Sequence, residues 1–594
     1  MKISRYFLMA LIPILAVGML MTSSCKKNDD PAEGYADLVV YGNIFTSEAG
    51  ETAQAFAVKD GRYVAVGTAK NIEKYVGNNT RIIEHGEGMV MAGCTEGHGH
   101  YLMSKFYEYG NHVIKITEND DKKSILSAIE GKAINNNDYI FGFGFDYLKL
   151  KDPGKYPTCQ EIDMIAEDIP VFLQDSEGHK GIANTRCLMD SGILTSDGKV
   201  KEGFKYKNYV VIDDYGFPTG MLLEQAGTYV RVHGCTPNDD SSVWYNCAIA
   251  AQKSLNEMGY TAAVEGWANK FGMVTYDVIK EMDKSNELTL DIGMAYEIEN
   301  LSKEEVSGEL SAAVVVKDKY SSNRVHANMI KLFEDGTPES GTGYMLEGDA
   351  FGRKGIAIWQ EDELKAITAD ANSKGLSMHI HAMGDYAVKT VVEAYASANK
   401  RAGVRNQIVH LRNVDNIDYD RMAQNGIIAS CGVLWHRSHP ASVVKENLEY
   451  LTSIMAEKYW YEGYPYQSFI NHKVHTSIST DAPASSGSPT DPFGIMEIAA
   501  TGTQNFSGQT YTIPWDEKEC IRDRADFLRS LTIEGAYQMG TDQTRGSIAV
   551  GKYADFILID QNVLTCPAAN LHKTKVVMTF FEGKCVYDMN APSA

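Results

Sequence analysis

Eight short apolar runs, bounded by turn residues and separated by longer segments, constrain the fold of this chain more than any other feature. They lie at 90–93, 261–267, 288–298, 328–333, 376–382, 407–411, 427–435 and 474–480. The segment after the fifth run has helical spacing, because Val388, Val391, Val392 and Tyr395 recur on one face. Strand-like runs that alternate with helical patterns predict βα units, and eight such units predict an α/β fold of the (β/α)₈ TIM-barrel type.

The two ends of the chain are rich in strand-like runs and turns. Residues 37–90 contain "DLVVYGNIFT" and "AFAVKDGRYVAVG", and residues 540–590 contain "GSIAVGKYADFILID" and "VVMTFFEGKCVYD". A Lys-Asp-Gly tripeptide between two of these runs signals a hairpin. We expect both ends to form one small β-sandwich domain. The barrel is then 91–539, with an insertion at about 101–258 that is long enough to cap its mouth.

The first residues are predicted to be a targeting segment and not part of the fold. "MKISRYFLMALIPILAVGMLMTSSC" places two basic residues before an apolar stretch that is too short, and too broken by Pro13 and Gly18, to span a membrane. We expect a secretory signal peptide at 1–24. The following junction resembles a loose bacterial lipobox, which would make Cys25 a lipidated first residue, with a polar tether at 25–36. A plainly cleaved signal with an incidental cysteine is the alternative.

The charge balance excludes one class of partner. The chain has 56 Lys and Arg against 78 Asp and Glu, a formal net charge of −22. Nucleic-acid binding needs clustered basic side chains, so we expect no nucleic-acid partner. The cysteines other than Cys25 form no CxxC pair, which argues against a disulfide framework.

Ionisable residues end several of the predicted strands, which is where the functional residues of such barrels lie. The stretch "GCTEGHGH" places two histidines two residues apart, so they point to the same side of an extended chain. Single residues follow from the fourth, fifth, sixth and eighth strands. The six candidates are His98, His100, Lys331, His381, His410 and Asp481. Imidazole and carboxylate are ligands of zinc-class metals, so the sequence predicts a metal site at the barrel mouth.

Three of these assignments have alternatives. An HxH pair by itself is more often incidental than a ligand pair. Lys331 has Glu334 and Asp335 close by in the sequence as ion-pair partners. His379 lies on the same face as His381, and we expect it to be a core histidine because His381 is closer to the barrel mouth.

Seven stretches occur in an order that resembles a known family. They are "MVMAGCTEGHGH", "GFGFDY" (142–147), "DSEGHKGIANT" (175–185), "IKLFEDG" (330–336), "HAMGDYAV" (381–388), "STDAP" and "GSIAVGKYADFILID". Together they are similar to the motifs of the metal-dependent amidohydrolase superfamily, and in detail to the amidohydrolase-3 family, which includes N-substituted formamide deformylase. The chain departs from the usual pattern at Glu96, where the family has Asp, and at Gly99, where an apolar residue is usual.

The resemblance implies one or two Zn²⁺ ions at the predicted site. The HxH pair and Asp481 would bind one metal, and His381 and His410 the second. Lys331 would bridge the two as a carboxylated lysine, because an amine cannot bridge two cations whereas a carbamate can. Asp481 would also be the general base for metal-activated hydroxide, which would attack the amide carbon.

Three further residues are candidates for contact with substrate. His179 in "SEGHKG" and His436 in "VLWHRSH" match family positions that face substrate, and either could donate a hydrogen bond to the tetrahedral oxyanion. The alternative for each is a solvent-exposed loop histidine. Asp146 in "GFGFDY" is expected to cap a turn and not to position substrate.

These observations predict a metal-dependent hydrolase that cleaves a carbon–nitrogen bond, of the amide but not the peptide type, in a small molecule. A dipeptidase, an aminoacylase or a cyclic-amide hydrolase on the same metal centre is the alternative among hydrolases. A catalytically inactive surface-binding lipoprotein and a metal-dependent isomerase or lyase are alternatives of other classes. The expected partners are the small amide-type substrate, the membrane through a lipid anchor at Cys25, and a second copy of the chain in a homodimer. The expected location is the cell envelope, on the periplasmic or the outer side of the outer membrane.

Overall fold

The computed structural model describes residues 34–591, apart from several internal segments. The internal segments left out are 51, 118, 135–137, 146–154, 176–177, 236–240, 300–302, 339–340, 350, 438–458, 460–462, 484–489, 507–508 and 513–516. The predicted signal peptide, Cys25 and Asp146 therefore lie outside the described residues. Within the part of the chain that is described, no helix is both long and apolar enough to cross a membrane.

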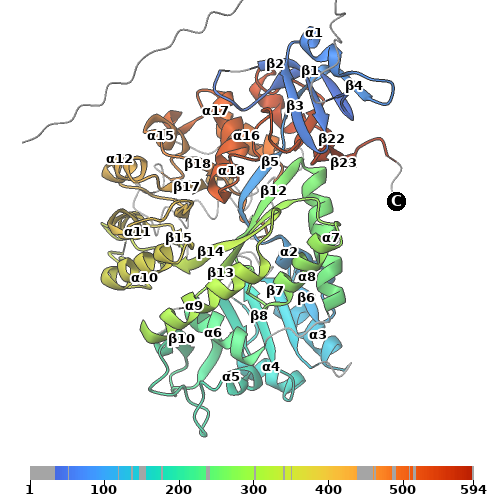
Figure 1. Cartoon of the computed structure of the whole chain (residues 1–594). Coiled ribbons are helices and arrows are strands. Elements are labelled where there is room, and N and C mark those ends of the chain that lie inside the picture. Colours follow the sequence, from blue (N-terminus) through green and yellow to red (C-terminus); the bar gives the residue numbers. More distant parts are fainter. Residues whose placement is uncertain are drawn as a thin grey trace, which may run out of the picture.

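Eight parallel strands form the central sheet, in sequence order around a nearly closed barrel (Figure 1). They are β5 (Cys94–Gly99), β12 (Tyr260–Glu265), β13 (Asp291–Glu297), β14 (Val325–Phe333), β15 (Ser377–Ala382), β16 (Gln407–His410), β17 (Ile428–Cys431) and β18 (Thr476–Ile478). A backbone hydrogen bond from Asp481 N to His98 O, 2.8 Å long, joins the segment after the last strand to the first strand. The predicted (β/α)₈ barrel is confirmed.

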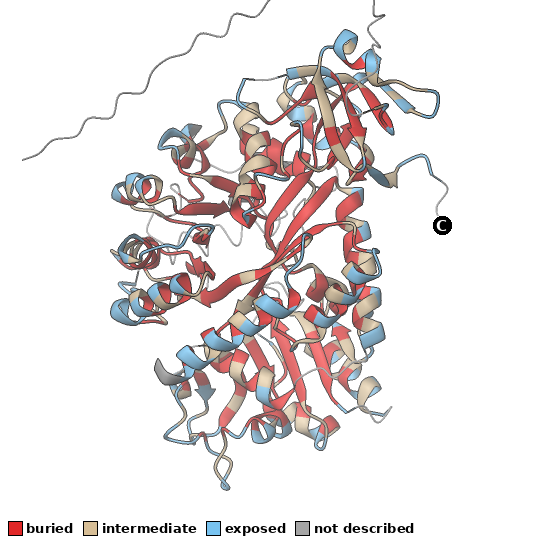
Figure 2. Ribbon diagram, in the orientation of Figure 1, coloured by how far each residue is buried: buried red, intermediate tan, exposed pale blue. Residues whose placement is uncertain are grey.

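Helices surround the barrel, with their exposed faces outward and the strands buried inside (Figure 2). They are α7 (Ser241–Glu257), α8 (Val274–Lys284), α9 (Lys303–Tyr320), α10 (Glu361–Ser373), α11 (Asp385–Ser397), α12 (Asn416–Gln424), α15 (Tyr466–Asn471), α16 (Pro492–Thr501), α17 (Arg524–Leu531) and α18 (Ile533–Met539). The apolar face predicted from the spacing of Val388, Val391, Val392 and Tyr395 is the buried face of α11.

The first barrel strand differs from the prediction. The apolar run at 90–93 was expected to be this strand, but residues through Ala92 belong to β4 (Arg81–Ala92), which pairs with strands of the terminal sheet. The chain changes partner at Gly93, whose N–H bonds to Asp555 O, whereas Cys94 N bonds to Gly259 O in the barrel. A continuous apolar run gives no sign of such a change, because both sheets bury it equally.

Seven strands from both ends of the chain form the terminal sheet, in the order β23-β22-β21-β4-β1-β2-β3. Those not yet given are β1 (Leu38–Phe45), β2 (Thr52–Lys59), β3 (Arg62–Gly67), β21 (Phe556–Ile559), β22 (Val576–Phe581) and β23 (Lys584–Asp588). Antiparallel pairing of β4 with β21 joins the two ends. The strands form one hydrogen-bonded sheet that folds back on itself, because the ring of Phe56 in β2 lies 4.9 Å from that of Phe556 in β21, in a core shared by both ends of the chain. A second apolar cluster includes Ile72 of α1 (Ala69–Ile72).

The insertion between β5 and β12 folds around a six-stranded sheet on the side of the barrel opposite the terminal sheet (Figure 1). Its strands are β6 (Val113–Lys115), β7 (Ile140–Phe145), β8 (Val171–Asp175), β9 (Lys180–Ala183), β10 (Val210–Ile212) and β11 (Pro218–Leu223). Its helices are α2 (Tyr101–Tyr109), α3 (Lys122–Ala133), α4 (Cys159–Ala166), α5 (Thr185–Asp190) and α6 (Glu224–Gly234). The start of α6 and the loop before β9 reach the barrel mouth, where they add residues to the site described next.

Candidate metal centre

Three ligand-type side chains come together at the carboxyl end of the barrel. Suitable atoms of His98, His410 and Asp481 lie within 4.8 Å of one another. Asp481 Oδ1 also lies 3.0 Å from His100 Nε2 and 3.4 Å from His98 Nε2. Both histidines of the HxH pair therefore face the same carboxylate, and these residues could hold a divalent metal ion.

His381 and Lys331 lie beside this cluster, on neighbouring strands. The ring centroid of His381 is 4.4 Å from that of His410. Burial above all, with the charge of the nearby Lys331 as a further cause, lowers the pKa of both His381 and His410 well below the usual value. The two imidazoles are therefore neutral, which is the form that binds a metal.

Lys331 is buried inside the barrel, where its Nζ lies 4.2 Å from the ring centroid of Phe333. Burial lowers the pKa of Lys331 to about 8, although the negative charges of Asp481 and Glu297 oppose the shift. Among the described residues it forms no ion pair, so the alternative pairing with Glu334 or Asp335 is wrong. Asp335 instead accepts hydrogen bonds from three backbone N–H groups, those of Tyr344, Met383 and Gly384.

The backbone at His410 turns its side chain into the barrel. Gln407 faces the interior, where it contacts His379, so regular alternation along β16 would turn His410 toward the surrounding helices. His410 and Leu411 instead have φ angles of 75° and 50°, in the left-handed region. This strained conformation places His410 Nδ1 4.0 Å from Asp481 Oδ2.

A chain of hydrogen bonds from the barrel core determines which nitrogen of His98 faces the site. Gln538 Nε2 donates to Gly97 O at 2.7 Å and also to Gln407 Oε1. His379 Nδ1 donates to the same Gln407 oxygen at 2.8 Å, because that oxygen can only accept. The His379 Nε2 lone pair then accepts a hydrogen bond from His98 Nδ1 at 2.6 Å. His98 Nε2 is left with a lone pair directed into the site, as a metal ligand requires.

The surroundings of this nitrogen fit a metal ion. His98 Nε2 is buried and has no hydrogen-bond partner among the described residues, a cost that a bound metal would remove. Gly266 makes room for the ring, since an added Cβ would lie 2.2 Å from His98 Cε1. Glu265 Oε1 lies 3.6 Å from His100 Nδ1, which favours a proton on that nitrogen and leaves Nε2 to face Asp481.

The two departures from the family pattern have structural explanations. Glu96 Oε1 accepts hydrogen bonds from His98 N at 3.1 Å and from Thr480 N at 2.8 Å, across the seam between β5 and β18. Gly99 lies against the ring of Tyr101, where an added Cβ would be 2.5 Å from a ring carbon. Neither departure removes a candidate ligand atom.

Of the three further candidates, His179, His436 and Asp146, the structure places His179 at the site. His179 is buried, its Nδ1 lies 2.8 Å from Glu224 Oε2, and its ring centroid is 5.4 Å from that of His381. The alternative of a solvent-exposed loop histidine is therefore wrong for His179. His436 belongs to the short 3₁₀ helix Val433–Arg437, but its side chain lies outside the described residues, as does Asp146.

Several residues at the site were not found from the sequence. Glu265 and Glu297 end the second and third barrel strands, so the strand-end rule that found the ligand candidates would have found them as well. No such rule finds Gln407 and Gln538, because the sequence around a buried glutamine does not indicate which residue it will bond to.

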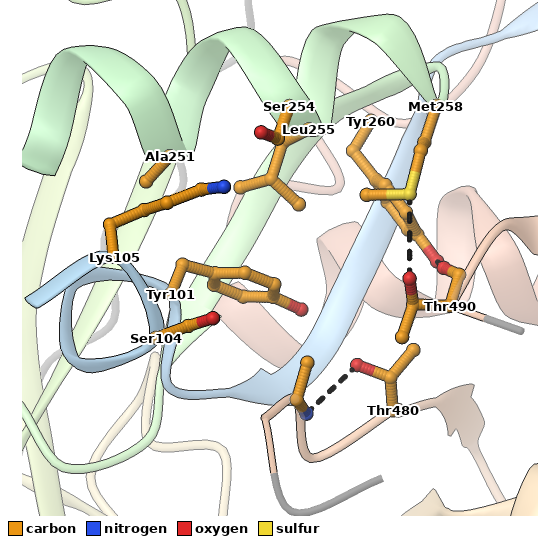
Figure 3. A pocket seen from close by; sticks show the side chains of 11 residues that line it. Tyr101, Ser104, Lys105, Ala251, Ser254, Leu255, Met258, Tyr260, Thr480 and Thr490 are labelled. Atoms are coloured by element: carbon orange, nitrogen blue, oxygen red, sulfur yellow. Dashed lines mark hydrogen bonds between the residues drawn. The ribbon is translucent and has the colours of Figure 1, made fainter. Parts of the chain in front are cut away.

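A cavity of about 150 Å³ lies next to the cluster, between α2, α7 and the segment after β18 (Figure 3). Three of the lining residues are chain neighbours of ligand candidates, since Tyr101 follows His100 while Thr480 and Ala482 flank Asp481. Ala482 N donates to Thr480 Oγ1 at 3.2 Å, which holds this turn (Figure 3). None of the six candidates lines the cavity, so it lies behind the metal centre and not where the ligand atoms meet.

A parallel eight-stranded barrel with imidazole and carboxylate groups at its carboxyl end is the arrangement of metal-dependent hydrolases of the (β/α)₈ type. The model of the amidohydrolase family matches residues 82–587, and the chain belongs to this family. It is a metal-dependent hydrolase that acts on carbon–nitrogen bonds.

Individual relatives are distant but match over nearly their whole length. The chain is 23% identical to Protein LONG AFTER FAR-RED 3 of Arabidopsis thaliana, over 97% of this chain and 96% of that protein. It is 22% identical to N-substituted formamide deformylase of Arthrobacter pascens, over 93% of this chain and 98% of that protein. The solved structure of an uncharacterized metal-dependent hydrolase from Pyrococcus horikoshii has the same fold, with a TM-score of 0.67, 18% identity, and coverage of 90% of this chain and 99% of that one.

Proposed function

We propose that this hydrolase cleaves the carbon–nitrogen bond of small amides that are not peptides, and that N-substituted formamides are the first substrates to test. The observation that carries the proposal is the convergence of His98, His410 and Asp481 beside a buried Lys331. The similarity to a formamide deformylase over almost the entire chain supports the choice of substrate.

Zinc is the metal that we propose for this site. The HxH pair and Asp481 would hold one ion, and His381 with His410 a second. A bound divalent ion supplies acidified water and polarises the substrate carbonyl. Lys331 would lie between the two positions as a carbamate, and its low pKa supports this role because only the neutral amine reacts with carbon dioxide.

Two residues of the chain would handle protons and charge. Burial would raise the pKa of Asp481, but its close contacts with the imidazoles of His100 and His98 hold that pKa well below its usual range, so a carboxylate is available to take a proton and return it to the leaving nitrogen. His179 would donate a hydrogen bond to the developing oxyanion. Glu224 holds His179 through Nδ1, which stabilises a second proton on Nε2.

Metal content and hydrolysis, measured together, test this proposal. Protein that begins after Cys25 is purified without chelator, its metals are counted by elemental analysis, and hydrolysis of N-substituted formamides is followed by amine release. We expect about two ions per chain, in line with a two-metal site, and fewer in Lys331→Ala. Metal-replete Asp481→Asn that retains full activity would contradict the assigned proton transfer. Protein that binds no zinc would favour the inactive binding protein.

We also propose that the chain is attached to the outer membrane by a lipid on Cys25. The support is the lipobox-like junction that precedes this residue. Mass spectrometry of the N-terminal peptide from the expressing bacterium tests it, with Cys25→Ser as the control variant. A free, unmodified Cys25 in membrane-fraction protein would contradict the anchor.

A further inference from the structure

Two buried cysteines meet inside the insertion, where helices α5 and α6 pack together. Cys187 is in α5, and Cys235 follows the last residue of α6. Cys187 is 0% exposed and Cys235 2% exposed. An added Cβ on Gly234, the residue before Cys235, would lie 2.1 Å from Cys187 O and 3.1 Å from Cys187 Sγ. The end of α6 therefore lies directly against the side chain of Cys187.

The two thiols are also in contact with each other. Burial raises the pKa of Cys187 well above its usual value, and the next causes are a hydrogen-bonding contact with the Cys235 thiol and the charge of its thiolate form. The other polar neighbours are backbone oxygens. Cys187 Sγ lies 3.9 Å from Val230 O, and Cys235 Sγ lies 3.6 Å from Ile140 O. A thiol is a weak donor, so these contacts hold the two sulfurs only loosely apart.

We propose that Cys187 and Cys235 form a disulfide bond in the exported protein, which links α5 to α6. A disulfide forms without backbone movement only where two segments of a chain approach as closely as these do. The proposal depends on export by the predicted leader, because disulfides persist in oxidising compartments outside the cytoplasm. The two thiols lose two electrons and two protons as the sulfur–sulfur bond forms, and a protein disulfide of the cell envelope takes them up and becomes a dithiol.

The burial of both sulfurs determines when this bond forms. A buried, neutral thiol does not react with external disulfides, because the thiolate is the nucleophile and the partner cannot reach it. The oxidant therefore reaches the two thiols while the insertion is still folding. Once the insertion has folded, the same burial protects the bond from reductants.

The bond is at one end of α6, and the other end of this helix contacts His179. Glu224 begins α6, its carboxylate lies 2.8 Å from His179 Nδ1, and it accepts a hydrogen bond from Thr342 Oγ1 at 2.7 Å. Glu224 has a φ angle of 46°, a left-handed conformation that the surrounding contacts must hold. A cross-link at the end of α6 restricts the unfolded insertion and so stabilises the folded arrangement that contains this conformation.

Peptide mapping of exported protein tests the proposal. The chain from residue 26 is directed to a bacterial periplasm by a standard cleavable leader, denatured in excess alkylating reagent without reductant, and digested. We expect one pair of linked peptides that contains Cys187 and Cys235 and that separates on reduction. Alkylation of both Cys187 and Cys235 in the periplasmic protein overturns the proposal, as does a link from either of them to a different cysteine.

Stability measurements distinguish one bond from two free thiols. Cys187→Ala and Cys235→Ala are each expected to lower the midpoint of thermal unfolding of the periplasmic protein by about 5 °C or more. Each change breaks the same bond, so the double variant should lose little more than either single variant. Cys247→Ala is the control, because Cys247 of α7 is also 0% exposed, and its loss should add to that of Cys187→Ala. Losses that add for Cys187→Ala and Cys235→Ala overturn the proposal.

Discussion

His98 Nδ1 lies 2.6 Å from His379 Nε2, so a histidine of the barrel core holds a candidate metal ligand in place. His379 is itself held by Gln407, whose side-chain oxygen can only accept a hydrogen bond. Gln407 therefore sets the orientation of His98 through His379, although neither Gln407 nor His379 is a candidate ligand. Metal affinity in this chain depends on the polar groups inside the barrel as well as on the ligands themselves.

Replacement of Gln407 by methionine should weaken metal binding. The methionine cannot accept the His379 proton, so His379 and His98 are free to exchange tautomers and the Nε2 lone pair is no longer secured. We expect the apparent dissociation constant for zinc to rise by about 10- to 100-fold, as for other groups that support metal ligands. Chelator competition measures it. Gln424→Met, on the exposed face of α12, is the control, and equal affinities in the two variants would contradict the hydrogen-bond chain.

Replacement of Glu224 by glutamine should lower kcat with little change in metal content. The carboxylate beside His179 Nδ1 stabilises a charged ring, and the neutral amide does not. We expect kcat to fall by about 10- to 100-fold, which is no more than the fall caused by complete removal of an oxyanion donor. Steady-state kinetics with parallel metal analysis measures this change. Glu257→Gln, at the exposed end of α7, should behave as the parent protein, and a loss of zinc in Glu224→Gln would show a structural role instead.

Arg545 should be essential for attachment of the terminal sheet to the barrel. Its guanidinium group lies 2.5 Å from Asp555, 2.6 Å from Glu582 and 3.6 Å from Asp291, and it is 3% exposed. Arg545→Met leaves these buried carboxylates without a counter-charge, which costs about 3–5 kcal/mol. Denaturant unfolding measures the loss. Arg529→Met, which removes a more exposed pair with Asp526, should cost less than about 1 kcal/mol, and similar losses would contradict the role of the buried network.

The His326–Asp291 pair should make stability depend on pH above neutrality. His326 Nε2 lies 2.7 Å from Asp291 Oδ1, and although burial opposes the shift, the charge and hydrogen bond of Asp291 raise the pKa of His326. A raised pKa in the folded state gives stability that is complete below the unfolded value of about 6.5 and is lost as pH rises through the folded value. The parent should therefore exceed His326→Gln in unfolding free energy at pH 5.5, and less so at pH 9. A difference that is constant between these pH values would contradict the pairing.

Local patterns were sufficient for much of the fold. The apolar spacing of Val388 and Val391 predicted α11, and strand-like runs that ended in ionisable residues predicted where His98 and Asp481 would lie. These features were readable because a helix repeats every few residues and a strand every two, so a buried face appears as a short-range pattern. The parallel strands of a barrel all have their carboxyl ends on one side, so polar residues at these ends lie close together at one mouth.

The sequence by itself therefore determined the barrel, the family and most of the candidate ligands. Only the tertiary structure decided that the chain changes sheets at Gly93, that a left-handed φ turns His410 inward, and that Gln538 reaches Gln407 across 131 residues of sequence. It also decided that Cys187 and Cys235 meet where α5 packs against α6. The physical reason is that hydrogen bonds and charges act over a few ångströms in space, and closure of a barrel brings together groups whose distance along the chain carries no trace of their contact.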